Sequence, residues 1–159
     1  MNFLSENDIT SKSGVIGLHV GAGKPQNRWS AIKFAELIDQ LHQQYKCSVI
    51  LTGSSSDIEE IEYVNKHTNV KTVQFLNKTI PELAALISRV NLFITNDTGV
   101  MHVAGTTGTP QISVFGPTNP FNWAPVGPNK YFIRKSDLID DISVEEVYNL
   151  AKMILGNVE

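Results

Sequence analysis

The chain has 159 residues, of which 42% are hydrophobic and 18% are charged, and its formal net charge is −3. This length matches one globular domain, which buries about 70% of the surface of its unfolded chain. The small negative charge gives no electrostatic attraction to nucleic acid or to an anionic membrane, so the composition argues against both partners.

Residues 1–14 are predicted to be a polar leader, because strand and helix patterns begin only at Val15. The leader has no basic start and no continuous apolar region, and no run of about 18 apolar residues occurs anywhere in the chain. The cytoplasm is therefore the predicted location. The single cysteine, Cys47, lies in an apolar run and is predicted to be a buried, reduced thiol.

Six short segments are rich in apolar and β-branched residues and end at glycine or polar turns, which predicts six strands. They are VIGLHV (15–20), CSVILT (47–52), VKTVQF (70–75), VNLFIT (90–95), QISVF (111–115) and YFIR (131–134).

Helical periodicity follows most of these strands. Ser30 is predicted to be the N-cap of the first helix, and residues 57–66 form a shorter, more polar second one. Thr79 and Glu82 have the spacing of a capping box ahead of the third helix. Residues 143–155 carry an apolar stripe and close the chain as a helix.

Strands that alternate with helices at this spacing predict right-handed crossovers and a parallel sheet covered on both faces. The predicted fold class is α/β, a doubly wound, Rossmann-like domain over residues 15–159. In such sheets ligands bind outside the carboxyl ends of the strands, where loops and helix N-termini converge. Candidate site residues are therefore sought in those loops.

The loop after the fourth strand, TNDTGVMHVAG, carries Asp97, Thr98, Gly99 and His102. Thr98 and Gly99 are predicted to open a helix whose free backbone amides favour an anion. Small residues there let a phosphate approach the backbone. Alternatively, Asp97 or Thr98 is only an N-cap and His102 only a helix-surface residue.

The loop after the first strand, GAGKPQNRWS, adds Gly21, Gly23, Lys24 and Arg28. It is neither a Walker A motif nor GxGxxG, because no GKS or GKT closes it and Gln26 stands at the last glycine position. Two cations and two glycines at the same sheet edge would nevertheless suit a diphosphate.

The loops after the second and fifth strands supply the remaining candidates. Asp57 ends TGSSSD, at a position where doubly wound nucleotide-binding domains often hold ribose hydroxyls. The alternative is that Ser54 to Asp57 cap the second helix, and the two roles are compatible. Thr118, in FGPTNPFNW, can donate a hydroxyl, and Trp123 could cover a ring or merely pack.

Taken as a set, HVGAG…NRWS, TGSSSD, FITNDTGVMHVAG and FGPTNP resemble the C-terminal domain of glycosyltransferase family 9, the heptosyltransferases of lipopolysaccharide assembly. The resemblance runs from about Val15 to the last helix. The chain departs from the family at Asn27, where a lysine is common two residues before the tryptophan, and at Ser30, where proline is common. Lys24 or Arg28 would then supply the missing charge.

The resemblance implies one half of a GT-B fold that binds a nucleoside diphosphate sugar, typically ADP-heptose. Asp97, Thr98 and Gly99 match the family's pyrophosphate-contacting turn, His102 matches its nearby histidine, and Asp57 matches its acidic ribose-binding position. The sugar would pass to a lipopolysaccharide-type, lipid-linked acceptor. The protein is therefore expected to meet a membrane only indirectly, through this acceptor.

The resemblance also implies that the general base and the acceptor site belong to an N-terminal half or subunit, with residues 1–14 as the remnant of the linker between the halves. The implied reaction is an inverting displacement that uses no cofactor. The four histidines are scattered and Cys47 is alone, so the sequence predicts no metal site.

Two alternatives stay open at this point. One is a nucleotide-binding module without catalysis of its own, as a single half-enzyme would be. The other is an NAD-dependent oxidoreductase domain, which the predicted sheet allows although the first loop lacks the third glycine.

Overall fold

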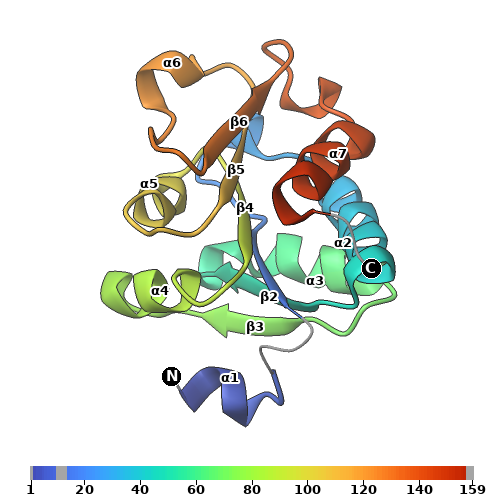
Figure 1. Cartoon of the computed structure of the whole chain (residues 1–159). Coiled ribbons are helices and arrows are strands. Elements are labelled where there is room, and N and C mark those ends of the chain that lie inside the picture. The colour runs from blue at the N-terminus through green and yellow to red at the C-terminus, as the bar shows by residue number, and fades with distance from the viewer. Residues whose placement is uncertain (1, 10–13, 157–159) are drawn as a thin grey trace.

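The structure is a computed structural model that describes residues 2–9 and 14–156. Its centre is a six-stranded, all-parallel sheet in the order β3-β2-β1-β4-β5-β6 (Figure 1). This is the strand order of the Rossmann fold, and the order reverses direction between β1 and β4. The predicted α/β, doubly wound fold class is confirmed.

All six predicted strands form, with ends that differ by a few residues from the predicted ranges. They are β1 (Val15–His19), β2 (Ser48–Gly53), β3 (Val73–Leu76), β4 (Leu92–Asn96), β5 (Gln111–Phe115) and β6 (Lys130–Arg134). Every residue of β1, β4 and β5 is buried, which explains why these central strands are continuous apolar runs.

A helix follows each of the six strands, and after β1, β2 and β6 a short 3-10 turn comes before it. The helices are α1 (Asn2–Glu6), α2 (Ala31–Tyr45), α3 (Ile58–His67), α4 (Ile80–Ile87), α5 (Gly99–Gly105), α6 (Pro120–Trp123) and α7 (Val144–Leu155). Short 3-10 turns at η1 (Pro25–Asn27), η2 (Ser55–Asp57) and η3 (Ile139–Asp141) lie within the connecting loops.

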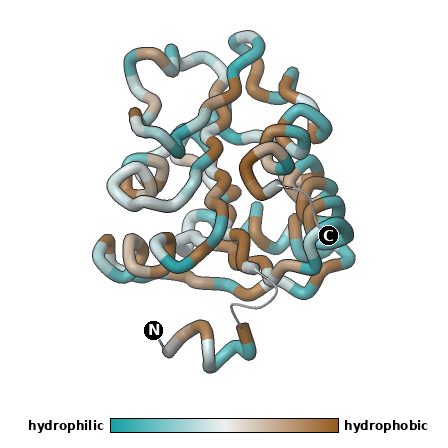
Figure 2. The backbone as a smooth tube through the Cα atoms, viewed as in Figure 1, coloured by the Kyte–Doolittle hydropathy of each residue, from teal (hydrophilic) through white to brown (hydrophobic). Residues whose placement is uncertain are grey.

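Helices cover the sheet on both faces. On one face α2, α3 and α7 pack together over the strands, and their core includes Trp29, Phe34 and Val147. On the other face α4 and α5 cover a second cluster, which includes Phe75, Ile87 and Phe93. Figure 2 shows the hydrophobic residues concentrated along the strands between these layers.

Capping residues set the starts of three elements. The predicted capping box of Thr79 and Glu82 is present at α4, and Ser143 forms the same motif with Glu146 at α7. Ser54 and Asp57 form a third one at η2. Ser30 does occupy the N-cap position of α2, but its side chain makes no capping hydrogen bond.

We expect Ser143→Ala to lower the free energy of unfolding by about 1 kcal/mol, because the Ser143 hydroxyl accepts a hydrogen bond from the backbone N–H of Glu146 at 3.1 Å. Urea denaturation measures this change. Ser88→Ala is the control, since that exposed hydroxyl only donates to the Ala84 carbonyl at the end of α4, and we expect a change within about 0.5 kcal/mol. Equal losses in the two variants would contradict the capping role.

The leader contains an element that the sequence analysis did not predict. Residues 2–6 form the helix α1, and Phe3 meets Phe75 edge-on with 4.8 Å between the ring centroids. Ile9 is buried in the same apolar cluster. Positions 1 and 10–13 of the predicted leader lie outside the described residues. The described part of the leader therefore packs on the domain beside β3.

Candidate functional site

The loops that follow β1 and β4 meet at the point where the strand order reverses, and one buried side chain joins them. The Asn96 amide nitrogen donates to the carbonyl oxygens of Val20 and Gly21, both at 3.1 Å. Its amide oxygen accepts from the backbone N–H of Trp29 at 3.0 Å. Asn96 therefore holds the first loop against the turn that begins at Asp97.

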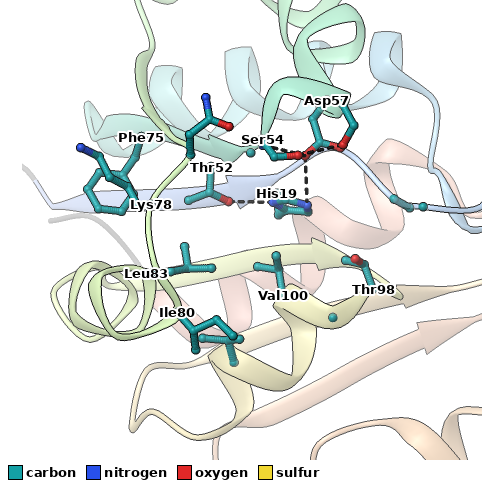
Figure 3. Close-up of a pocket in the computed structure, with 17 residues that line it drawn as sticks. His19, Thr52, Ser54, Asp57, Phe75, Lys78, Ile80, Leu83, Thr98 and Val100 are labelled. Atoms are coloured by element: carbon teal, nitrogen blue, oxygen red, sulfur yellow. Dashed lines mark hydrogen bonds and ion pairs between the residues drawn. The ribbon is translucent and has the colours of Figure 1, made fainter.

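A first cavity of about 400 Å³ opens between the ends of β1 and β2 and the helices α4 and α5. Figure 3 shows one wall of polar groups, with His19, Thr52 and Asp57 close together, and an opposite wall of apolar side chains. The apolar lining residues are Phe75, Ile80, Leu83, Val100 and Val103. A ligand with one flat apolar part and several hydroxyls would match this lining.

Asp57 belongs both to the first cavity and to the capping box before α3. Its Oδ2 accepts from the backbone N–H of Ser54 at 2.9 Å and from the Ser54 hydroxyl at 3.2 Å. The predicted capping role is therefore confirmed, and the ribose-binding role stays a prediction. Gly21 packs beneath this carboxylate, where a β-carbon would overlap Asp57 Oδ1.

His19 is a buried histidine at the end of β1 that also lines the first cavity. Its Nδ1 lies 2.9 Å from the Thr52 hydroxyl, and its Nε2 lies 3.9 Å from Asp57 Oδ2. Burial lowers the pKa of His19 more than the nearby Asp57 carboxylate raises it. The imidazole is therefore neutral at pH 7.

A second cavity of about 500 Å³ lies on the other side of the Asp97–Gly99 turn. Gly23, Thr98 and Gly99 line both cavities, so the two are adjacent. The other lining residues of the second cavity are Lys24, Asn27, Asp97, Thr118 and Trp123.

Backbone is exposed where the two cavities meet. A β-carbon built on Gly23 or on Gly99 would have nothing within 4 Å among the described residues. These glycines therefore leave room for a ligand, whereas Gly21 leaves room for the protein's own Asp57. Asn27 donates from its side-chain nitrogen to the Asp97 carbonyl at 3.4 Å and so links the first loop to the turn.

Two predicted site residues lie elsewhere. The Arg28 Nε donates to the Ala22 carbonyl at 2.9 Å, and its NH1 lies 3.0 Å from a Glu60 carboxylate oxygen. Arg28 thus connects the first loop to α3. It lines a separate surface hollow together with Glu60 and Tyr63. His102 is exposed on α5 and is not among the described residues that line the two cavities. Their predicted contacts with a donor remain predictions.

Comparison with known proteins agrees with this arrangement. The sequence model described as glycosyltransferase family 9 (heptosyltransferase) matches residues 3–153. This chain belongs to glycosyltransferase family 9. The predicted resemblance is therefore confirmed, and membership of a glycosyltransferase family argues against the oxidoreductase alternative.

Three relatives in the family illustrate the similarity. Lipooligosaccharide heptosyltransferase 2 of Campylobacter jejuni serotype O:6 is 32% identical over 119 residues, which are 71% of this chain and 38% of that protein. The crystal structure of a family 9 glycosyl transferase from Veillonella parvula has a TM-score of 0.88 at 28% identity, and the match covers 97% of this chain and 49% of that one. The structure of Escherichia coli ADP-heptose LPS heptosyltransferase II has a TM-score of 0.84 at 24% identity, with coverage of 97% and 50%. The chain thus spans about half the length of the two solved structures and less than half the length of the Campylobacter jejuni protein.

The structure adds cavity residues that the sequence analysis missed in this family 9 domain. Asn77 and Lys78 follow β3 and line the first cavity, and Asn77 has a positive φ of 55° that asparagine tolerates. The rule that ligands bind at the carboxyl ends of parallel strands applies to this loop too, so it would have identified both residues. His19 was missed because it was assigned to a strand interior.

Two further searches cover only the part of the chain that the structure describes. Among residues 2–9 and 14–156, no three histidine, cysteine or carboxylate side chains gather in a way that could hold a metal ion. No helix in the same ranges is long and apolar enough to cross a membrane.

Proposed function

We propose that this chain is the donor-binding domain of an inverting glycosyltransferase, which moves a sugar, most simply a heptose, from ADP to a lipopolysaccharide-type acceptor. The observation that carries the proposal is the pair of adjacent cavities at the reversal point of the sheet, with Gly23, Thr98 and Gly99 between them. A nucleoside diphosphate sugar has a matching order of parts: base and ribose, then diphosphate, then sugar.

In this proposal the first cavity holds the nucleoside. The base lies against the apolar wall formed by side chains such as Leu83 and Val103, since a flat ring gains most from burial against apolar atoms. The ribose faces the polar wall near Asp57, whose carboxylate can accept hydrogen bonds from hydroxyl groups.

The second cavity holds the diphosphate and the sugar. Lys24 supplies a cation there, and Thr118 supplies a hydroxyl. The first N–H groups of α5, those of Gly99 and Val100, have no carbonyl one turn earlier in the helix to donate to, and both residues line the first cavity. They can therefore donate to phosphate oxygens that cross between the cavities.

The proposed reaction is a direct displacement at the anomeric carbon. A carboxylate removes the proton of an acceptor hydroxyl, the oxygen bonds to the anomeric carbon, and the bond from that carbon to the diphosphate oxygen breaks. The negative charge that develops on the leaving diphosphate is met by backbone N–H groups and by Lys24 rather than by a metal ion. The base and the acceptor are proposed to come from a separate N-terminal half or subunit in the cytoplasm.

Calorimetry with ADP and the purified chain tests the binding step. We expect a saturable 1:1 isotherm, and a flat titration at millimolar ADP would contradict the proposal. The alternative, a nucleotide-binding module without catalysis, differs in a second assay. Transfer from ADP-heptose that begins only when an N-terminal half is added would support the enzyme, whereas binding without transfer under any such pairing would favour the module.

We expect Lys24→Gln to weaken ADP binding about tenfold, because it removes a charge-assisted contact from the second cavity. The loss should shrink as salt is raised from about 0.05 M to about 0.5 M, since ions screen the same charge. Arg28→Gln is the matched control, because Glu60 and the Ala22 carbonyl already engage that guanidinium. If Arg28→Gln weakened ADP binding more than Lys24→Gln did, the diphosphate would not lie in the second cavity, and this part of the proposal would be wrong.

A further inference from the structure

The polar wall of the first cavity contains a nitrogen and an oxygen that face each other without a hydrogen bond. His19 Nε2 and Asp57 Oδ2 are 3.9 Å apart, which is too long for a hydrogen bond (Figure 3). The His19 ring is 5% exposed, and no described residue offers Nε2 a closer polar partner. Because His19 lines the first cavity, a ligand atom can reach Nε2 from there.

The rest of the ring is fixed in place. Thr52 lies 2.9 Å from Nδ1, and its hydroxyl also lies 3.4 Å from the Leu18 carbonyl. Asp57 is held just as firmly, because Ser54 donates twice to its Oδ2. These contacts hold the gap between Nε2 and Oδ2 open, and a ligand atom that enters the first cavity can bridge it.

The chemistry of the gap selects a hydroxyl group. The imidazole is neutral, so Nε2 either donates or accepts a single hydrogen bond, and the Asp57 carboxylate only accepts. A hydroxyl can serve both atoms when the ring carries its proton on Nε2: the hydroxyl oxygen accepts from Nε2–H, and its own proton is donated to Asp57. In that tautomer Nδ1 accepts from the Thr52 hydroxyl. A phosphate oxygen cannot donate to Asp57 and would be repelled by its charge.

We propose that His19 Nε2 and Asp57 Oδ2 together bind one ribose hydroxyl of the donor nucleotide, and that His19 thereby makes the site specific for ribonucleotides. This inference rests on the proposed function, which places a nucleoside in the first cavity. It goes beyond the predicted ribose contact of Asp57, because it adds His19 as a second residue that binds the same hydroxyl. The sequence pattern alone assigns His19 to a strand and not to the site.

Calorimetry with ADP, 2′-deoxy-ADP and 3′-deoxy-ADP tests the proposal. We expect the parent chain to bind one of the two deoxy compounds at least tenfold more weakly than ADP, since that compound has no hydroxyl to bond with His19 Nε2 and Asp57 Oδ2. His19→Asn keeps an amide group within reach of Thr52 but has no atom at the Nε2 position. Its preference for ADP over the same deoxy compound should be at least about threefold smaller than the parent's, because only the Asp57 contact with the hydroxyl remains.

His42→Asn is the matched control, because His42 also engages a partner through Nδ1, the Cys47 carbonyl at 2.9 Å, but lines neither cavity. It should keep the parent's preference for ADP. A parent chain that binds ADP and both deoxy compounds equally would overturn the role of His19, and so would a His19→Asn variant that keeps the preference.

A measurement on the unmodified chain avoids any effect of the substitution on folding. In long-range ¹H–¹⁵N spectra, the His19 Nε2 resonance should shift when ADP is added and stay near its free position with the discriminated deoxy compound. An unchanged Nε2 resonance at saturating ADP would overturn the inference while leaving the proposed function intact. No binding of ADP at all would instead contradict the proposed function, and the histidine contact with it.

Discussion

A Gly99→Val chain is expected to fold like the parent and to bind ADP about a hundredfold more weakly. Gly99 lines both cavities, and a β-carbon there would meet no described protein atom within 4 Å. The added methyl groups would therefore occupy the space through which a diphosphate passes, and they would hold it away from the backbone N–H groups. A hydrogen bond to a charged group is worth about 1.5–3 kcal/mol, so the loss of one or two such donors corresponds to about this factor.

The matched control is Gly108→Val. Gly108 is also exposed, has open space around a built β-carbon and follows the same helix, but it lines neither cavity. Calorimetry should give the parent's ADP affinity for Gly108→Val, and urea denaturation should place both variants within about 1 kcal/mol of the parent. Equal ADP affinity in the two valine variants would remove the turn after β4 from the nucleotide site.

The sheet could be predicted from the sequence because each strand is a short apolar run bounded by turn residues. The central strands β1, β4 and β5 are buried along their whole length, which is the condition under which such runs are least ambiguous. The helix α1 could not be predicted in this way. Its five residues are too few for a helical period, and its packing depends on a distant contact between Phe3 and Phe75.

The site was only partly predictable, because the contacts that orient some of its residues are distant in the sequence. Loop position identified Lys24, Thr98 and Gly99, which the structure brings together around the second cavity. Periodicity cannot separate an apolar residue that packs in the core from one that lines a cavity, so the sequence does not identify Leu83 as a cavity residue. Arg28 is predicted in the site by its loop position and its charge, but its orientation is set by Glu60, a partner 32 positions away in the sequence.

Asn96 shows most clearly how packing changes the interpretation of a motif residue. In the sequence it is a turn residue of NDTG, whereas in the structure it ends β4 and is fully buried between the two loops that form the site. Its amide donates to two carbonyl oxygens and accepts from one N–H, and the two donated hydrogen bonds require an amide rather than a carboxylate. The architecture of the site therefore depends on a residue that lines neither cavity.

We expect Asn96→Asp to lower the free energy of unfolding by about 3 kcal/mol or more at pH 7.5, although the two side chains have nearly the same shape. The carboxylate can still accept from the Trp29 N–H, but it places a buried negative charge against the carbonyl oxygens of Val20 and Gly21, which lose their donor. Asn91→Asp is the control. That side chain is exposed, and its oxygen only accepts from the Val15 N–H at 2.8 Å, so a carboxylate serves equally well.

The pH dependence of the Asn96→Asp variant separates this explanation from a general loss of packing. Burial and the facing carbonyl oxygens should raise the pKa of the new carboxyl in the folded state above its unfolded value of about 3.9. The folded state then binds the proton more tightly, so the stability deficit relative to the parent should shrink as pH falls from about 8 towards 5. Urea denaturation across this range measures the deficit. A deficit that stays constant with pH would show that the amide hydrogen bonds do not hold the two loops together.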